Sequence, residues 1–464
     1  MQLKHLASGL LLTASLTAAA QTTGGISADM MREIQKSYQG TASDKAIQNA
    51  IANTNIKTLA LSLDNKKEMD TYFSHRVVSK GVSDQESSGR CWLFTGLNIL
   101  RAKMMAEYNL PDMMFSHNYL SFYDQLEKAN LFLQGIINTR EKPMEDQMVT
   151  WHFRNPLSDG GQFTGVSDLI DKYGLVPAGV MPETNSSNNT ATMAQLVSTK
   201  LREYALDIRS NDFPTDAKAQ EEAKTKMLAT IYRMLVLNLG EPVTEFEWTR
   251  KDASGKAIET KKYTPHSFYN EFFGDKLTDK YVMVMNDPCR EYYKVYEIDY
   301  DRHVYDGYNW TYLNLPIEEV SDIAIASIKD STMMYFSCDV GKFLDAKRGL
   351  LDINNYDYAS LMGTEFGMNK KERVQSFASG SSHAMTLMAV DLDENGKPKK
   401  WMVENSWGAS HGYKGHLIMT DEWFQEYMFR LVFEKKYVPK KFLKLLEQEP
   451  IKLPSWDPMF APEQ

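Results

Sequence analysis

The sequence predicts an α+β fold with a helical N-terminal half and a strand-rich C-terminal half. Between Leu93 and Met105, apolar residues recur every three or four positions, as on one face of a helix. From Tyr281 onward the apolar spacing moves towards two, in segments such as YYKVYEIDY and HAMTLMAVDL, and this spacing is typical of β-strands. Because the two patterns occupy different halves of the chain, we expect helices and strands to be segregated.

The N-terminal half begins with a polar arm and continues into two long helices. The arm spans residues 21–80 and shows a weak helical pattern only at Lys45–Ile56. Ser87 or the serine after it can cap the next helix, which ends before Pro111. Another helix is predicted to begin at Ser116, because tyrosines and leucines follow it at helical spacing.

Further helices and one hairpin are predicted before the strands begin. Residues 155–182 are rich in turn-forming residues and include a short helix at Val166–Tyr173. Residues 190–239 contain many Ala, Lys, Glu and Leu and predict two helices separated near Pro214. Asp252–Lys261 is charged and carries Ser-Gly near its centre, which predicts a β-hairpin.

The N-terminus indicates where the protein resides, and the net charge indicates which partners it is expected to bind. Residues 1–20 combine a short basic start, an apolar run at Leu6–Thr17 and an Ala-Ala-Ala site, which predicts a cleaved export signal. The run is shorter than the roughly 20 residues that span a bilayer, so we expect no stable membrane insertion. The formal charge is −9, and an acidic protein has little attraction for phosphate backbones, so no nucleic-acid partner is expected. An exported protein, periplasmic or secreted, is expected.

Only three cysteines are present, and their odd number leaves at least one thiol outside any disulfide. Cys91 lies in QESSGRCWLFTG, at the first turn of a predicted helix, where backbone N–H groups favour a reactive thiolate. The alternative for Cys91 is a buried structural cysteine. Cys289 follows a proline and Cys338 lies in an apolar run, so we interpret both as structural, and a disulfide between them stays open.

Gln85 is a candidate for stabilising an oxyanion beside Cys91. It lies six residues before the cysteine. Its side-chain amide and the Cys91 backbone N–H would provide two donors for the negative charge that develops on a carbonyl oxygen during acyl transfer. The alternative is a solvated loop glutamine.

His383 and Asn405 are predicted to meet across a β-hairpin. His383 opens the run HAMTLMAV, Asn405 closes WMVEN, and Asn395-Gly396 between them is a strong turn signal. Pairing the two residues centres the loop on Glu394, and directly opposed side chains have Cβ atoms about 4.5–5.5 Å apart. An amide at that distance can orient an imidazole, as a nucleophile–base pair requires. Trp407 either shields this contact or belongs to the core.

These motifs together resemble the papain superfamily of cysteine peptidases, most closely its bleomycin hydrolase and aminopeptidase C branch. The matching segments are QESSGRCW, SSHAMTLMAVD and VENSWG, and outside them DGGQFTGVSDLIDKYG, SCDVGKF and LPSWDPM. The resemblance extends over roughly residues 60–464. It implies a papain-like two-lobed fold, with a helical lobe, an antiparallel β-barrel-like lobe and a helical insertion.

The resemblance also implies an activity and a role for each motif. Cys91 is the expected nucleophile, His383 the general base and acid, Asn405 the residue that orients the imidazole, and Gln85 an oxyanion donor. The implied enzyme is a cysteine aminopeptidase that releases N-terminal residues from peptides through a thioester acyl-enzyme. No metal or organic cofactor is implied, and the implied assembly is a homohexamer. A papain-like endopeptidase and a catalytically silent peptide-binding scaffold are the alternatives.

Substrate binding is expected at a glycine pair and at the C-terminal arm. Gly160 and Gly161 match the pair that lets an extended peptide lie against the backbone in this superfamily. A proline-stiffened arm is expected to enter the cleft and end at Gln464, whose carboxylate would bind the amino terminus of a substrate. Two departures stand out. The branch is usually intracellular, and its best-known tail reads close to WDPMGALA, whereas this chain has WDPMFAPEQ.

The expected organisation has six parts. They are the export signal at 1–20, the N-terminal arm at 21–80, a helical lobe with Cys91 at 81–185, a helical insertion at 186–275, a strand-rich lobe with His383 and Asn405 at 276–450, and the C-terminal arm at 451–464.

Overall fold

The computed structural model describes residues 24–66, 69–274 and 276–459. The chain divides into two compact units, Met1–Leu61 and Ser62–Gln464. In the first unit, Ser, Thr and Asn side chains cap three helices, α1 (Ala28–Ser37), α2 (Ala42–Asn53) and α3 (Ile56–Leu59). Helix α2 confirms the helical pattern at Lys45–Ile56 over most of its length. The expected export signal lies outside the described residues.

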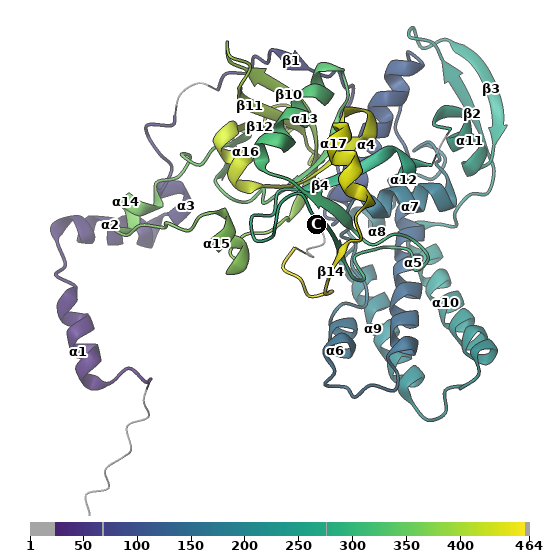
Figure 1. The fold of residues 1–464 in the computed structure, drawn as a ribbon, viewed down its shortest axis with the longest axis horizontal. Helices are drawn as coiled ribbons and strands as arrows, with labels where there is room; N and C mark the ends of the chain where they lie inside the picture. Colours follow the sequence, from purple (N-terminus) through teal and green to yellow (C-terminus); the bar gives the residue numbers. More distant parts are fainter. Residues whose placement is uncertain (1–23, 67–68, 275, 460–464) are drawn as a thin grey trace, which may run out of the picture. The chain divides into compact units, whose positions relative to one another are not determined.

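The first part of the second unit is helical, as predicted. Ser116 caps α5 by accepting the N–H of Tyr119 at 3.0 Å, and Gly174, with φ of +77°, ends α7. Pro214 separates α9 from α10, which run beside α5 (Figure 1). The helices are α4 (Cys91–Glu107), α5 (His117–Asn138), α6 (Gln147–Arg154), α7 (Phe163–Tyr173), α8 (Asn185–Asn188), α9 (Ala191–Arg209) and α10 (Ala217–Leu239).

The segment expected to be a helical insertion also contains two strands. β2 (Phe246–Lys251) and β3 (Ala257–Tyr263) pair antiparallel, which confirms the hairpin predicted at Asp252–Lys261. Gly255 in its turn has φ of +84°, a conformation that glycine adopts without strain. Two helices follow, α11 (Pro265–Phe272) and α12 (Leu277–Lys280).

The remaining strands form one mixed sheet of twelve strands, in the order β14-β5-β6-β4-β13-β7-β10-β11-β12-β9-β8, with β1 beside β10. Three pairings are parallel: β4 with β6, β5 with β14, and β9 with β12. The α+β fold class with a helical and a strand-rich part is confirmed. Within the described residues the sheet has two ends and does not close, so the strand-rich part is an open mixed sheet and not an antiparallel barrel. The strands at its ends, β14 and β8, are only three and two residues long, and they offer few backbone groups for closure.

The strands are β1 (His75–Arg76), β4 (Tyr281–Met285), β5 (Val295–Ile298), β6 (Thr311–Asn314), β7 (Met334–Cys338), β8 (Leu344–Asp345), β9 (Leu350–Leu351), β10 (His383–Leu392), β11 (Pro398–Glu404), β12 (His416–Thr420), β13 (Met428–Glu434) and β14 (Ile451–Leu453). Between them lie the helices α13 (Ile317–Lys329), α14 (Tyr358–Met362), α15 (Lys370–Gln375), α16 (Asp421–Tyr427) and α17 (Lys440–Leu443), and two short 3-10 turns, Lys435–Tyr437 and Lys444–Glu447.

Helix α4 joins the helical part to the sheet. It packs against β10 and α7 and buries side chains on all its faces, including Trp92, Leu93 and Leu97. A Cβ at Gly96 would lie 2.6 Å from Val166 Cγ1, so only glycine fits where α4 meets α7. The packing therefore fixes the first residue of α4 relative to the first residues of β10. Among the described residues, we find no helix with both the length and the apolar character needed to cross a bilayer.

Candidate active site

Cys91 is the first residue of α4, and its side chain is buried. The predicted serine cap is wrong, because Arg90 is the N-cap residue and no side chain caps the helix. Ser88 is engaged elsewhere: its hydroxyl donates to the Gln85 carbonyl at 2.6 Å. The first turn of α4 contains no acidic residue, so nothing there opposes the preference of a helix N-terminus for negative charge. This position favours a thiolate at Cys91.

The sulfur of Cys91 lies beside the start of β10. The backbone N–H of Ala384 donates to Cys91 Sγ at 3.4 Å, and His383 is the preceding residue. A donor aimed at sulfur stabilises the charged form of the thiol. The thiol and the imidazole therefore come from two elements that the packing of α4 on β10 brings together.

His383 and Asn405 meet by their side chains, as predicted. His383 Nε2 lies 2.9 Å from Asn405 Oδ1, and both residues are buried. Because Nε2 is engaged by the amide, Nδ1 is the ring nitrogen through which a base at this position would exchange a proton. The indole of Trp407 lies over the imidazole with ring centroids 4.9 Å apart, so this tryptophan does cover the contact.

The predicted register of this hairpin is wrong. The ladder pairs Thr386 with Glu404 and, nearest the turn, Leu392 with Pro398, so the partners differ from the predicted ones by two positions at both ends and by three between the irregularities near Ala389 and Leu392. On the other side of β10, His383 lies opposite Cys338 of β7. Asn405 is the residue after β11, and from there its side chain reaches the imidazole.

Gln85 is held by both ends of its amide. Its Oε1 accepts the hydroxyl of Ser406 at 2.6 Å, and its Nε2 donates to the Ser88 carbonyl at 2.6 Å. An amide nitrogen has two hydrogens, so the contact with Ser88 still permits one bond to an oxyanion. Ser406 also donates its backbone N–H to Asn405 Oδ1 at 2.8 Å. Ser406 therefore links the side-chain amide of Asn405 to that of Gln85.

Sequence reasoning missed Ser406 and a second connection, a buried ion pair of Arg101 in α4 with Glu404 at the end of β11. Both side chains are about 1% exposed, and Ser79 also donates to Glu404 at 2.7 Å. Ser406 lies inside the motif VENSWG and could have been found there, whereas nothing in the sequence connects Arg101 with Glu404. The ion pair ties the helix of Cys91 to the strand that precedes Asn405.

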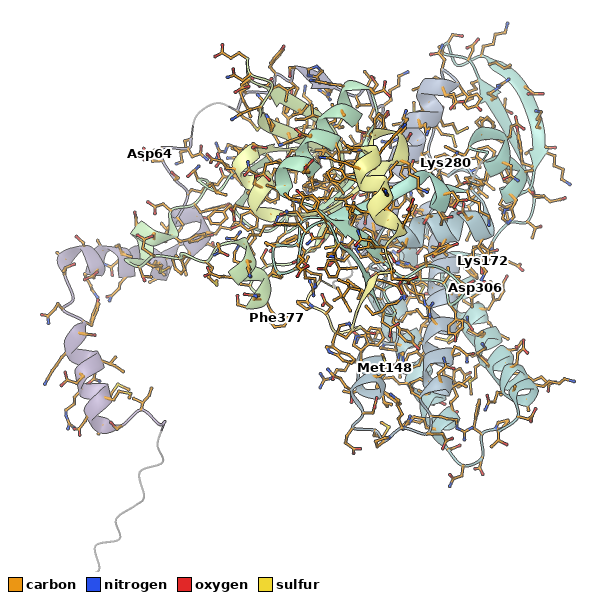
Figure 2. The ribbon with its side chains drawn as sticks, in the orientation of Figure 1. Asp64, Met148, Lys172, Lys280, Asp306 and Phe377 are labelled. Carbon is orange, nitrogen blue, oxygen red and sulfur yellow. The ribbon has the colours of Figure 1, made fainter. Side chains whose placement is uncertain are left out.

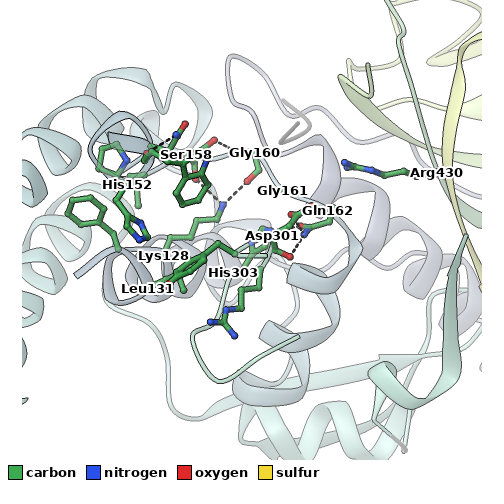
Figure 3. Close-up of a pocket in the computed structure, with 17 residues that line it drawn as sticks. Lys128, Leu131, His152, Ser158, Gly160, Gly161, Gln162, Asp301, His303 and Arg430 are labelled. Carbon is green, nitrogen blue, oxygen red and sulfur yellow. Dashed lines mark hydrogen bonds between the residues drawn. The ribbon is translucent and has the colours of Figure 1, made fainter. Parts of the chain in front are cut away.

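Gly160 and Gly161 lie next to the residues that flank Cys91. Asp159 accepts the backbone N–H of Gly89 at 2.7 Å, and its carbonyl accepts the indole N–H of Trp92 at 2.8 Å. The glycines line a pocket with Lys128, His303 and Arg430 (Figure 3). A Cβ at Gly161 would lie 2.1 Å from the His303 ring, so packing within the protein already requires glycine there.

The other two cysteines are not arranged for catalysis. No disulfide joins any of the three cysteines, all of which are described, so the pairing of Cys289 with Cys338 that the sequence left open is not made. Cys338 is buried in β7. Burial, together with the nearby Asp287 carboxylate, raises the pKa of Cys289 to about 11, which keeps this thiol protonated at neutral pH.

A cysteine at a helix start, beside the first residues of a strand whose histidine is bound by an amide, is the arrangement of a cysteine peptidase of the papain type. Comparison with known proteins agrees. The model of the Peptidase C1-like family matches residues 25–460, and the chain belongs to this family.

Relatives of known name cover most of the chain. It is 39% identical over 402 residues to bleomycin hydrolase of Mus musculus, covering 84% of this chain and 88% of the relative. It is 34% identical over 435 residues to aminopeptidase C of Listeria monocytogenes, covering 93% and 97%. The crystal structure of PepW from Lactobacillus rhamnosis superposes with a TM-score of 0.90 at 36% identity, covering 94% of this chain and 99% of that one.

Proposed function

We propose that this cysteine peptidase is an aminopeptidase that removes N-terminal residues from peptides. The observation that carries the proposal is the convergence of Cys91, His383 and Asn405, with 2.9 Å between His383 Nε2 and Asn405 Oδ1 and 3.4 Å between Cys91 Sγ and the Ala384 nitrogen. Relatives named aminopeptidase C and aminopeptidase W support the assignment to N-terminal residues.

The reaction has two halves, the acylation of Cys91 and the hydrolysis of the thioester, and His383 transfers a proton in both. His383 takes the proton of the Cys91 thiol, and the thiolate attacks the scissile carbonyl carbon, so that a C–S bond forms and the carbonyl π electrons move to oxygen. The Gln85 amide and the Cys91 backbone N–H stabilise this oxyanion. The C–N bond then breaks, and the leaving amine takes the proton from His383. Water, deprotonated by His383, attacks the thioester in the same way and releases the acid and the thiol.

The described part of the C-terminal arm is held by contacts with two arginines. These contacts support the proposal that the arm excludes longer peptides from one side of the cleft. Asp457 is nearly buried and forms an ion pair with Arg290, which also binds Asp287. The carbonyl of Met459 accepts from Arg430 Nη2 at 2.7 Å, and Arg430 lines the same pocket as Gly160 and Gly161. We call Arg290, Arg430 and Asp457 the arm clasp.

We therefore propose that the arm continues from Met459 into the cleft and blocks the non-primed side. Phe460–Gln464, and with them the predicted substrate contact of Gln464, lie outside the described residues. A blocked non-primed side leaves room for only one or a few residues before the scissile bond, so a substrate is cut near its amino terminus.

A pair of matched peptides tests this function. Peptides that differ only in acetylation of the amino terminus are incubated with the protein and with Cys91→Ala. We expect the wild type to release single residues from the amino-free peptide. It should cut the acetylated peptide at least about ten times more slowly, because the charge-assisted contact of the amine is lost. Cys91→Ala should cleave neither peptide. Internal cleavage of both peptides at equal rates would favour the endopeptidase alternative.

We further propose that the protein is exported after cleavage near Ala20. Support comes from the short basic start, the apolar run and the small residues before Gln21. Mass spectrometry of the natural protein should find its amino terminus near Gln21, and an intact Met1 in most molecules would contradict export.

We also propose a homohexamer, which rests on the resemblance to the bleomycin hydrolase branch alone. Light scattering from the purified protein should give a mass of about six chains of 53.1 kDa. A monomeric mass at micromolar concentration would contradict it.

A further inference from the structure

The pocket beside Gly160 and Gly161 contains a nearly buried lysine. Lys128 lies in α5, and its side chain is 11% exposed. Its ammonium donates to Asp124 Oδ2 at 2.8 Å, to the Ser158 carbonyl at 2.9 Å and to the Gly160 carbonyl at 2.6 Å (Figure 3). An ammonium has three donors, so these acceptors use all of them. Two of the three bonds hold backbone carbonyls of the segment that carries the glycine pair.

The acid that holds Lys128 is itself fixed. Asp124 is 1% exposed, and its second oxygen lies 2.5 Å from His303 Nδ1. Burial acts to raise the pKa of Asp124, but Lys128 and His303 outweigh it, and the net shift lowers the pKa. Asp124 is therefore a carboxylate at neutral pH, and the position of Lys128 is set by a buried negative charge that cannot turn to solvent.

His303 extends the same network to the far side of the glycine pair. Its Nε2 lies 2.8 Å from Gln162 Oε1, and the Gln162 Nε2 donates to the Asp301 carbonyl at 3.0 Å. The segment is thus held at Ser158 and Gly160 by Lys128, and at Gln162 by His303. The His303 ring also packs against Gly161. The backbone of residues 158–162 is therefore fixed both in its path and in its distance from the His303 ring.

We propose that Lys128 is a positioning residue for peptide binding, which fixes the Gly160–Gly161 backbone in the conformation that receives an extended substrate. Asp124 and His303 act by holding Lys128 and the segment. This inference rests on the proposed function, since it assumes that a peptide binds along the glycine pair. The physical reason is preorganisation: a backbone that is already held loses little conformational freedom when substrate hydrogen bonds form.

Lys128→Met tests the proposal, because methionine keeps the length of the side chain and removes all three donors. We expect KM for an amino-free peptide to rise roughly 10-fold, the scale of one weakened hydrogen bond, with kcat changed less than about twofold. Lys172→Met is the matched control. Lys172 pairs with Glu127 at 2.8 Å and with Asp306 at 2.9 Å (Figure 2). It is not among the residues that line the pocket of Gly160 and Gly161, so KM of the Lys172→Met variant should stay at the wild-type value.

Backbone amide hydrogen exchange gives a readout that does not depend on turnover. In Lys128→Met, exchange should accelerate in residues 158–162 and stay unchanged in α4 and β10. Faster exchange with no peptide hydrolysis by the wild type would retain the positioning role and reject the proposed function. If Lys128→Met does not fold, Lys128→Arg keeps the charge beside Asp124 and should show the same changes to a smaller degree. Wild-type KM and wild-type exchange in a folded variant would overturn the proposal, and so would a fall in kcat at constant KM.

Discussion

Two of the buried histidines, His383 and His303, are held by different kinds of partner. His383 is bound by the neutral amide of Asn405 at 2.9 Å. His303 lies between the carboxylate of Asp124 at 2.5 Å and the amide oxygen of Gln162 at 2.8 Å. Each ring also faces an indole, Trp407 for His383 and Trp92 for His303. The two sites are alike in burial and aromatic packing, and they differ in that a carboxylate binds His303 whereas a neutral amide binds His383.

This difference suits two different tasks. A general base must gain and lose a proton in every cycle, and an amide accepts from Nε2–H whether the ring is neutral or charged. His303 has an oxygen atom within hydrogen-bond distance of each ring nitrogen. Burial and the charge of Lys128 lower the pKa of His303 to about 4, and Asp124 opposes this shift only in part. His303 is therefore neutral at neutral pH and keeps one protonation state, as a structural residue should.

The largest expected effect is the loss of His383. His383→Ala should lower kcat by about 10³–10⁴-fold, because the thiol loses its base, while the thermal unfolding temperature changes little. His303→Leu should give the opposite pattern, with lower stability and higher KM. Steady-state kinetics and calorimetry on both variants separate the two roles. If kcat fell in His303→Leu as much as in His383→Ala, at unchanged KM, the assignment of a structural role to His303 would be contradicted.

Removing the amide of Asn405 should lower kcat less than removing the imidazole of His383. Asn405→Ala leaves His383 able to transfer protons but no longer fixes the ring, so we expect kcat to fall roughly 100-fold with residual activity. Ser406→Ala, which removes only the hydroxyl on Gln85, should have a weaker effect. Both are measured with the same amino-free peptide. Equal kcat for Asn405→Ala and the wild type would mean that Trp407 and the backbone orient the ring without the amide.

The arm clasp should affect specificity more than rate. Asp457→Asn removes the charge that Arg290 binds, and we expect cleavage of acetylated peptides to rise several-fold, with an upper scale of about 10-fold, while hydrolysis of amino-free peptides falls slightly. Glu449→Gln changes an exposed acid that lies two residues before the C-terminal arm, and it serves as the control. Unchanged selectivity in Asp457→Asn would show that the arm does not gate the cleft through this contact.

The smallest expected effect concerns the thiols at neutral pH. With a pKa of about 11, roughly one Cys289 in 10⁴ is a thiolate at pH 7, and this fraction rises tenfold for each pH unit up to the pKa. Iodoacetamide should therefore modify Cys91 first at pH 7 and reach Cys289 only as the pH approaches 10. Peptide mapping follows both sites, and labelling of Cys289 at pH 7 as fast as Cys91 would contradict the assignment.

The sequence predicts those parts of the site that depend on local order. The helix start at Cys91, the strand that His383 opens and the turn at Asn395-Gly396 are local features, and the structure contains all three. The register is wrong by two positions already at the turn, where Leu392 pairs with Pro398. The prediction placed His383 directly opposite Asn405, whereas Asn405 follows β11 and reaches the imidazole from beyond the ladder.

Contacts between distant residues could not be predicted in this way. The ion pair of Arg101 with Glu404 joins residues 303 positions apart, and His303 lies 179 positions from Asp124. Each looks like an ordinary surface-type residue in the sequence, and only the fold brings the charges together. The open sheet was missed for the same reason, since closure depends on the end strands β14 and β8 and not on the alternation within each strand.

The most direct measurement is the mass of the covalent intermediate on Cys91. The protein, or Asn405→Ala if the wild type turns over too quickly, is mixed with an amino-free peptide, quenched in acid within milliseconds and digested for mass spectrometry. We expect a thioester on Cys91 whose added mass equals one amino-terminal residue of the substrate. An adduct of several residues, an adduct on Cys289 or Cys338, or continued turnover by Cys91→Ala would contradict it.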